Sequence, residues 1–136
     1  MTFPSARIED SATMRTDIQP ILARHPGLLH RMRFVDLRFE IHCAHDRLHV
    51  AVVDEQVTAV VASAEHSTAA SEFVLQAPEA AWKEFSQQMP APGYNDILAL
   101  LEAGHARFSG QGLGFYRNLF LVKAIVSAVF RGDARW

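Results

Sequence analysis

Histidine is the residue type whose number and spacing in this sequence first suggest chemistry. The chain has seven histidines, and His42, His45 and His49 lie close together in the segment "EIHCAHDRLHV". If His45-Asp46 forms the loop of a β-hairpin, His42 and His49 lie opposite each other on its outer face, where Glu40 or Asp46 could add a carboxylate ligand for a metal ion. No helical HExxH motif and no second cysteine accompany them. The pattern therefore favours solvated histidines over a metal site.

Nucleophilic catalysis finds equally little support. Cys43 is the single thiol, and strand-like alternation turns it inward, where burial disfavours the reactive thiolate. Ser109 lies in "RFSGQG", which is not the G-x-S-x-G motif of a nucleophile elbow. Gly110, Gly112 and Gly114 lack the Lys-Ser/Thr of a phosphate loop and the dinucleotide G-x-G-x-x-G pattern, so they predict a tight strand-to-helix turn. The sequence therefore predicts a protein that is not an enzyme and has no cofactor.

Length and composition predict one globular domain. A chain of 136 residues is long enough to bury a hydrophobic core without the help of disulfides. Its content of 49% hydrophobic and 21% charged residues is ordinary for a globular protein. The formal net charge of −2, with both signs spread along the chain, predicts no basic surface for nucleic acid. Residues 1–16 show no periodicity and no apolar run of a secretory signal. We therefore expect a flexible N-terminal tail over 1–16, a single domain over 17–136, and a cytoplasmic location.

Alternating apolar residues predict the strands. The alternation over 37–43 and again over 48–52 indicates a half-buried hairpin, followed by a third strand over 57–62. A fourth strand lies in "SEFVLQ", with Phe73 and Leu75 on one face, and a fifth in "HARFSG". With His45-Asp46 as the loop, the inward residues of the first two strands pair as Cys43 with Leu48, Ile41 with Val50, and Phe39 with Val52.

A helical period replaces the alternation after residue 77. Pro78 suits the first turn of a helix whose apolar stripe is Trp82, Phe85 and Met89. Asn95 is expected to cap the next helix, which Gly104 ends. A further short helix is expected in "TDIQPILARHPG", between Thr16 and Gly27. Together with the strands, this order predicts an α+β fold with a largely antiparallel sheet and helices on one face.

The last predicted helix is apolar around most of its circumference. It covers "GLGFYRNLFLVKAIVSAVF", where Arg117, Lys123, Ser127 and the following Arg131 form a narrow polar stripe. Arg117 and Lys123 lie inside the stretch, which argues against a membrane span. A buried core helix, a dimer face and the wall of a ligand cavity all remain compatible with the pattern.

The run "GHARFSGQGLGFYRNLFLVKAIVSAV" and the order of elements over residues 34–130 resemble the sterol carrier protein type-2 (SCP2) family. In that family a glycine, a five-residue strand and a second glycine lead into an apolar final helix. The corresponding positions here are Gly104 and Gly110, with the helix beginning near Leu113. The chain departs from the family at Gln111, where an acidic residue or Asn is more common, and in the proline-containing "QQMPAPGY".

The resemblance implies a five-stranded sheet covered by helices, with an apolar tunnel between them that holds lipids or acyl chains. The implied function is that of a non-catalytic carrier for a hydrophobic small molecule, such as a sterol or a fatty acyl chain, without stable membrane insertion. Tyr94 and Arg117 are expected to contact the ligand's polar head group. The candidate ligand-binding residues are Phe73, Trp82, Phe85, Tyr94, Ile97, Leu101, Phe115, Arg117, Leu119, Val122 and Val126.

Two other functions remain as alternatives. The apolar final helix could serve a protein-interaction module that docks a partner enzyme or a second copy of the chain. A cone-shaped α+β isomerase or dehydratase would instead need an Asp/His pair in a pocket, and His105 is then the best histidine for it. Such enzymes usually lead with helices and end on a curved sheet, whereas this chain leads with strands.

Overall fold

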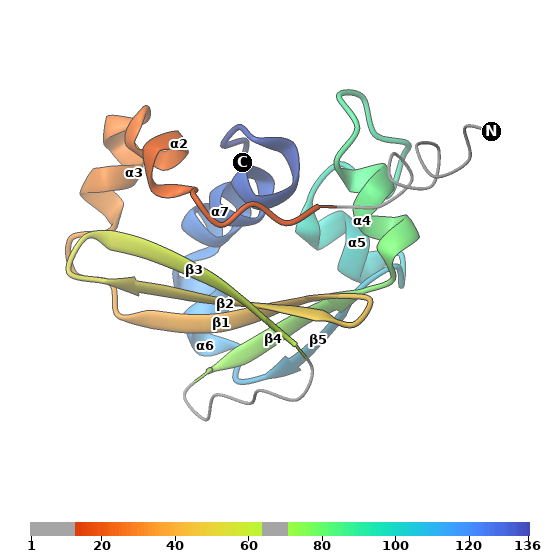
Figure 1. Ribbon diagram of the computed structural model, residues 1–136, viewed down its shortest axis with the longest axis horizontal. Helices are drawn as coiled ribbons and strands as arrows, with labels where there is room; N and C mark the ends of the chain where they lie inside the picture. The colour runs from red at the N-terminus through yellow and green to blue at the C-terminus, as the bar shows by residue number, and fades with distance from the viewer. Residues whose placement is uncertain (1–12, 64–70) are drawn as a thin grey trace.

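The computed structural model describes residues 13–63 and 71–136. A five-stranded sheet in the order β3-β2-β1-β4-β5 forms one layer, and most of the helices lie on one side of it (Figure 1). The strands are β1 (Leu37–Cys43), β2 (Asp46–Val53), β3 (Gln56–Ser63), β4 (Phe73–Ala77) and β5 (Arg107–Gly110). The helices are α2 (Gln19–Ala23), α3 (Pro26–Arg31), α4 (Glu79–Phe85), α5 (Ile97–Glu102), α6 (Leu113–Arg117) and α7 (Leu119–Arg131).

The sheet is mixed, with β1 at its centre. β1 pairs antiparallel with β2 and parallel with β4, where Phe39 lies beside Phe73. All other pairings are antiparallel. The prediction of an α+β fold with a largely antiparallel five-stranded sheet is confirmed.

The loop of the first hairpin is Ala44-His45, so the predicted register is wrong by two residues. Cys43 pairs with Asp46, and Ile41 pairs with Leu48 rather than with Val50. Ala44 adopts a left-handed φ of 56°, which suits a central position of a two-residue hairpin loop. Because side chains alternate with a period of two, this even shift leaves the predicted inward residues on the buried face.

The two middle helices differ from expectation at their ends. α4 ends at Phe85, so Met89 lies beyond it and is 88% exposed instead of continuing the apolar stripe. α5 is capped by Asp96 and not by Asn95, because the Asp96 Oδ1 accepts a hydrogen bond of 2.9 Å from the Ala99 backbone N–H.

Two short helices replace the single one expected between Thr16 and Gly27. α2 begins at Gln19 without a side-chain cap, and α3 begins at Pro26 and contains Gly27. Of the predicted tail, residues 1–12 lie outside the described residues. Within the described part, the Arg15 backbone N–H donates to the Val129 carbonyl at 3.0 Å.

The apolar run after Gly112 forms two helices rather than one. Asn118 leaves helical geometry at φ −115° and ψ 32°, and its side-chain amide donates to the Gly114 carbonyl at 3.0 Å. α7 is buried around most of its circumference, including Ser127, whose hydroxyl donates to the Asp133 carbonyl at 2.8 Å. Of the alternatives given for this run, which were a core helix, a dimer face and a cavity wall, the structure shows α7 as a core helix. Among the described residues, no helix combines the length and the apolar character needed to cross a membrane.

Candidate functional site

A stack of phenylalanines lies between the sheet and the final helices. The Phe73 ring of β4 stacks on Phe39 of β1 at 4.8 Å between centroids and on Phe108 of β5 at 5.3 Å. Phe115 of α6 meets Phe73 edge-on at 5.4 Å. Such arrangements are the favoured geometries of aromatic pairs. The stack joins three strands to α6 and forms an apolar interior on the helical side of the sheet.

A second aromatic group joins α4 to α7. Trp82 stacks on Phe130 at 4.4 Å between centroids and meets Phe85 edge-on, and its indole N–H donates to the His42 carbonyl at 2.9 Å. The Arg131 guanidinium lies 3.8 Å from the centroid of the Phe85 ring. The indole and the guanidinium both have partners, so this cluster fixes the helical layer to the sheet.

The candidate ligand-binding residues fall into three groups by exposure. Seven are buried in the core: Phe73, Trp82, Phe85, Ile97, Phe115, Val122 and Val126. Tyr94, Leu101 and Leu119 are half-buried and pack against that core, and Arg117 is exposed. The partly buried members therefore mark where the apolar interior reaches the surface.

Tyr94 lines a pocket of about 550 Å³ at the hairpin end of the sheet. Its ring stacks on His105 at 4.1 Å between centroids, and its hydroxyl lies 3.4 Å from His105 Nδ1. The described lining contains no Asp or Glu, so an Asp/His pair of the expected enzyme type is not assembled within the described part of this pocket. The lining residues are Ala44, Gln76, Ala77, Pro78, Ala80, Ala81, Tyr94, Gly104, His105 and Arg107.

Arg117 and Leu119 line a second pocket, of about 400 Å³, at the break between α6 and α7. The structure thus places Tyr94 and Arg117, the two expected head-group contacts, in different pockets. Leucine side chains and two guanidinium groups meet in this second pocket. Its lining residues are Arg31, Tyr116, Arg117, Asn118, Leu119, Phe120 and Leu121. Of these seven residues, the sequence reasoning named only Arg117 and Leu119 as candidates.

The histidines around the hairpin meet a buried carboxylate. His42 lies opposite Arg47 and His49 opposite Glu40, so the expected His42–His49 pair is wrong. Glu40 instead contacts both, with Oε1 at 2.8 Å from His42 Nε2 and Oε2 at 3.6 Å from His49 Nδ1. Among the described residues, no group of three or more His, Cys, Asp or Glu side chains has an arrangement that could hold a metal ion.

The surroundings of two buried groups explain their ionisation. Burial raises the pKa of Glu40, but hydrogen bonds from His42 and Ser71 and the charge of His49 outweigh it, so the pKa of Glu40 is lowered from its ordinary value of 4.5. Cys43 is buried as predicted, and burial together with the nearby carboxylates raises its pKa to about 11. A thiol of that pKa is a poor nucleophile at neutral pH.

Comparison with solved structures identifies the fold. The ubiquinone synthesis protein UbiJ-SCP2 superimposes with a TM-score of 0.53 at 14% identity, over 90% of this chain and 92% of that chain. A protein of Thermus thermophilus described as "possibly sterol carrier protein" superimposes with a TM-score of 0.55 at 12% identity, over 91% of this chain and 97% of that chain. The sequence matches no protein-family model, and no curated protein matches it. The fold is SCP2-like, as the sequence resemblance predicts.

Proposed function

We propose that this chain is a non-catalytic carrier for a hydrophobic small molecule, such as a sterol, a fatty acyl chain or a similar lipid. The observation that carries the proposal is the SCP2-like fold, whose apolar layer between sheet and helices reaches the surface at partly buried Leu119. A ligand with a long apolar part gains about 0.8 kcal/mol for each methylene group that it removes from water.

Between the two pockets, the one at the α6–α7 break suits an amphipathic ligand better. Leu119 and Leu121 supply apolar contact there, and the guanidinium groups of Arg31 and Arg117 can bind an anionic or carbonyl head group. The pocket beside Tyr94 is lined mainly by alanine, glycine and polar residues, which offer less apolar contact to a long chain. We therefore place the ligand's polar end near Arg117, with its apolar part directed toward the phenylalanine stack.

The interaction-module alternative is not favoured. Nine residues of α7 are buried within the chain itself: Leu121, Val122, Ala124, Ile125, Val126, Ser127, Ala128, Val129 and Phe130. A helix that already packs against its own domain on most sides presents little apolar surface to a partner.

The test combines native mass spectrometry of the purified protein with titration by a fluorescent acyl probe. Leu119→Arg places a charge at the apolar wall of the pocket and is expected to weaken probe binding at least about ten-fold. Met89→Arg is the matched control, because it makes the same change at an exposed site outside the helices. Circular dichroism confirms that both variants fold. The proposal would be refuted if wild-type protein purifies without a bound ligand and does not bind the probe. It would also be refuted if both variants lose probe binding equally.

A further inference from the structure

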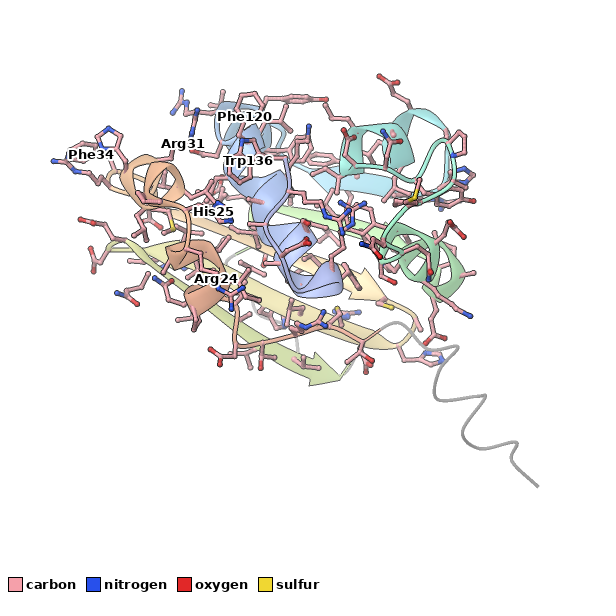
Figure 2. The ribbon with its side chains drawn as sticks, turned by 90° about the horizontal axis from the view of Figure 1, so that it is seen from above. Arg24, His25, Arg31, Phe34, Phe120 and Trp136 are labelled. Carbon is pink, nitrogen blue, oxygen red and sulfur yellow. The ribbon has the colours of Figure 1, made fainter. Side chains whose placement is uncertain are left out.

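Aromatic and basic side chains gather on the surface around α3. We call this surface the α3 face. In the view onto the helical layer in Figure 2, Arg31 lies on α3 and Phe120 on α7, while Arg24, His25, Phe34 and Trp136 lie in the segments next to α2, α3 and α7. Its aromatic members are Phe34 (92% exposed), Tyr116 (66%), Trp136 (49%) and Phe120 (47%). Its basic members are Arg24, His25, Arg31, Arg33 and Arg117. Exposed aromatics gathered on one face are unusual for a surface with no binding role.

Direct contacts connect these side chains along one short helix. At the start of α3, the His25 and Trp136 rings meet edge-on at 5.3 Å between centroids. At its end, the Arg31 guanidinium lies 5.3 Å from the centroid of the Phe120 ring. In the following turn, Arg33 lies at the same distance from the ring of Phe34. Cations and rings therefore sit side by side across the face.

The α3 face is positive although the whole chain is negative. Neither residues 18–35 nor residues 103–132 contain an Asp or Glu, and these two stretches supply every member of the face except Trp136. Nearby Asp96 pairs with Lys123 at 3.3 Å, and Asp133, next in sequence to these stretches, pairs with Arg135 at 3.0 Å. Asp17 and Asp36 flank the first stretch, where Asp36 pairs with Arg38 at 2.7 Å, and the Glu72 carboxylate lies beside Gly114 of α6. The net charge of the whole chain therefore does not describe the charge of this face.

We propose that the α3 face docks onto an anionic membrane surface. Tryptophan, tyrosine and phenylalanine beside arginine are the side chains that favour the boundary between head groups and acyl chains. The rings can enter that boundary while the arginines stacked on them remain level with the lipid phosphates. A second copy of this chain is a poorer occupant, because two identical positive faces repel each other.

Docking in this orientation would bring the α6–α7 pocket to the membrane, since Arg31, Tyr116, Arg117 and Phe120 belong to both the face and the pocket. That consequence rests on the proposed carrier function, whereas docking itself needs no cargo. Leu119→Arg separates the two, because it is expected to lose the acyl probe and keep membrane binding.

The experiment is co-sedimentation of the full chain with vesicles of phosphatidylcholine, either pure or with about one third phosphatidylserine. Each arginine near an anionic surface contributes about a five-fold gain in partitioning, so Arg31→Glu/Arg33→Glu is expected to lose at least about twenty-fold. Arg47→Glu/Arg107→Glu changes the net charge equally on β2 and β5, away from α3, and is expected to stay within about three-fold of wild type. Phe34→Ser is expected to lose several-fold and Met89→Ser to lose nothing.

Weak binding of wild type to pure phosphatidylcholine and selective loss in the α3-face variants would support the proposal. Equal loss in both double variants would overturn it, because net charge alone would then explain binding. If wild-type protein binds neither kind of vesicle, the proposal is overturned, and an acidic protein partner becomes the better candidate for the α3 face. A concentration-dependent mass that Arg31→Glu/Arg33→Glu abolishes would overturn it in favour of a second copy.

Discussion

Gly110 and Gly104 offer a matched pair that tests how closely β4 and β5 approach each other. Both adopt positive φ, at 107° and 81°, so an alanine at either position strains the backbone by about 1–2 kcal/mol. They differ in the space around them. A Cβ at Gly110 would lie 2.7 Å from the Phe73 Cα and would also overlap the Glu72 carbonyl, whereas a Cβ at Gly104 meets nothing within 4 Å.

The steric term decides the size of the two effects. The overlap at Gly110 involves backbone atoms, which cannot rotate away, and overpacking of this kind costs about 1–3 kcal/mol. Gly104→Ala is therefore expected to lower the free energy of unfolding by about 1–2 kcal/mol, and Gly110→Ala by about 2–5 kcal/mol. Urea denaturation followed by tryptophan fluorescence, to which buried Trp82 contributes, measures both. If the two variants unfold at the same urea concentration, the close approach of β5 to β4 is not as the structure has it.

Two further substitutions test the polar contacts of the core. Glu40→Gln is expected to cost about 2 kcal/mol near neutral pH, because it removes charge-assisted hydrogen bonds from a buried carboxylate. Folding lowers the pKa of Glu40, so this stabilisation is fully present above pH 4.5 and is lost as the pH falls through the pKa of the folded protein. The urea midpoints of variant and wild type should therefore converge in acid. A difference that stays constant with pH would contradict the reasoning. Arg131→Lys is expected to lower the free energy of unfolding by about 2–3 kcal/mol, because a lysine cannot keep the hydrogen bonds to the Phe85 and Asn95 carbonyls, at 2.7 and 2.9 Å, together with the ring contact. A thermal melt unchanged from wild type would refute it.

The period of the apolar residues was enough to predict the inward face of each strand and the α+β class, because periodicity reports burial. It could not give the register of the first hairpin. Register depends on which two residues form the loop, and Ala44 adopts a left-handed conformation that its residue type does not favour. Likewise, the sequence could not predict that Asn118 separates α6 from α7, because neither asparagine nor the residues next to it rule out a continuous helix.

Sequence reasoning named Arg117 and Leu119 as candidates but did not predict the pocket that both of them line. Arg31 reaches this pocket from α3, far away in sequence, and only the packing of α3 beside α7 brings it there. A signal for the α3 face was nevertheless present. Two long stretches without an acid, each carrying arginines and aromatics, indicate a one-sided charge distribution that a net charge of −2 conceals.

The parallel pair of β1 and β4 has a consequence for how the chain reaches its native state. The β1–β2 hairpin closes between neighbours, with Cys43 beside Asp46, but Phe39 must find Phe73, thirty-four positions away (73 − 39). Closing the longer loop costs more entropy before its contacts form. The meander β1-β2-β3 is therefore expected to assemble early, and the free edge of β1 then serves as the template on which β4 pairs. Substitutions in the meander should then slow folding, whereas substitutions in β4 and β5 should mainly speed unfolding.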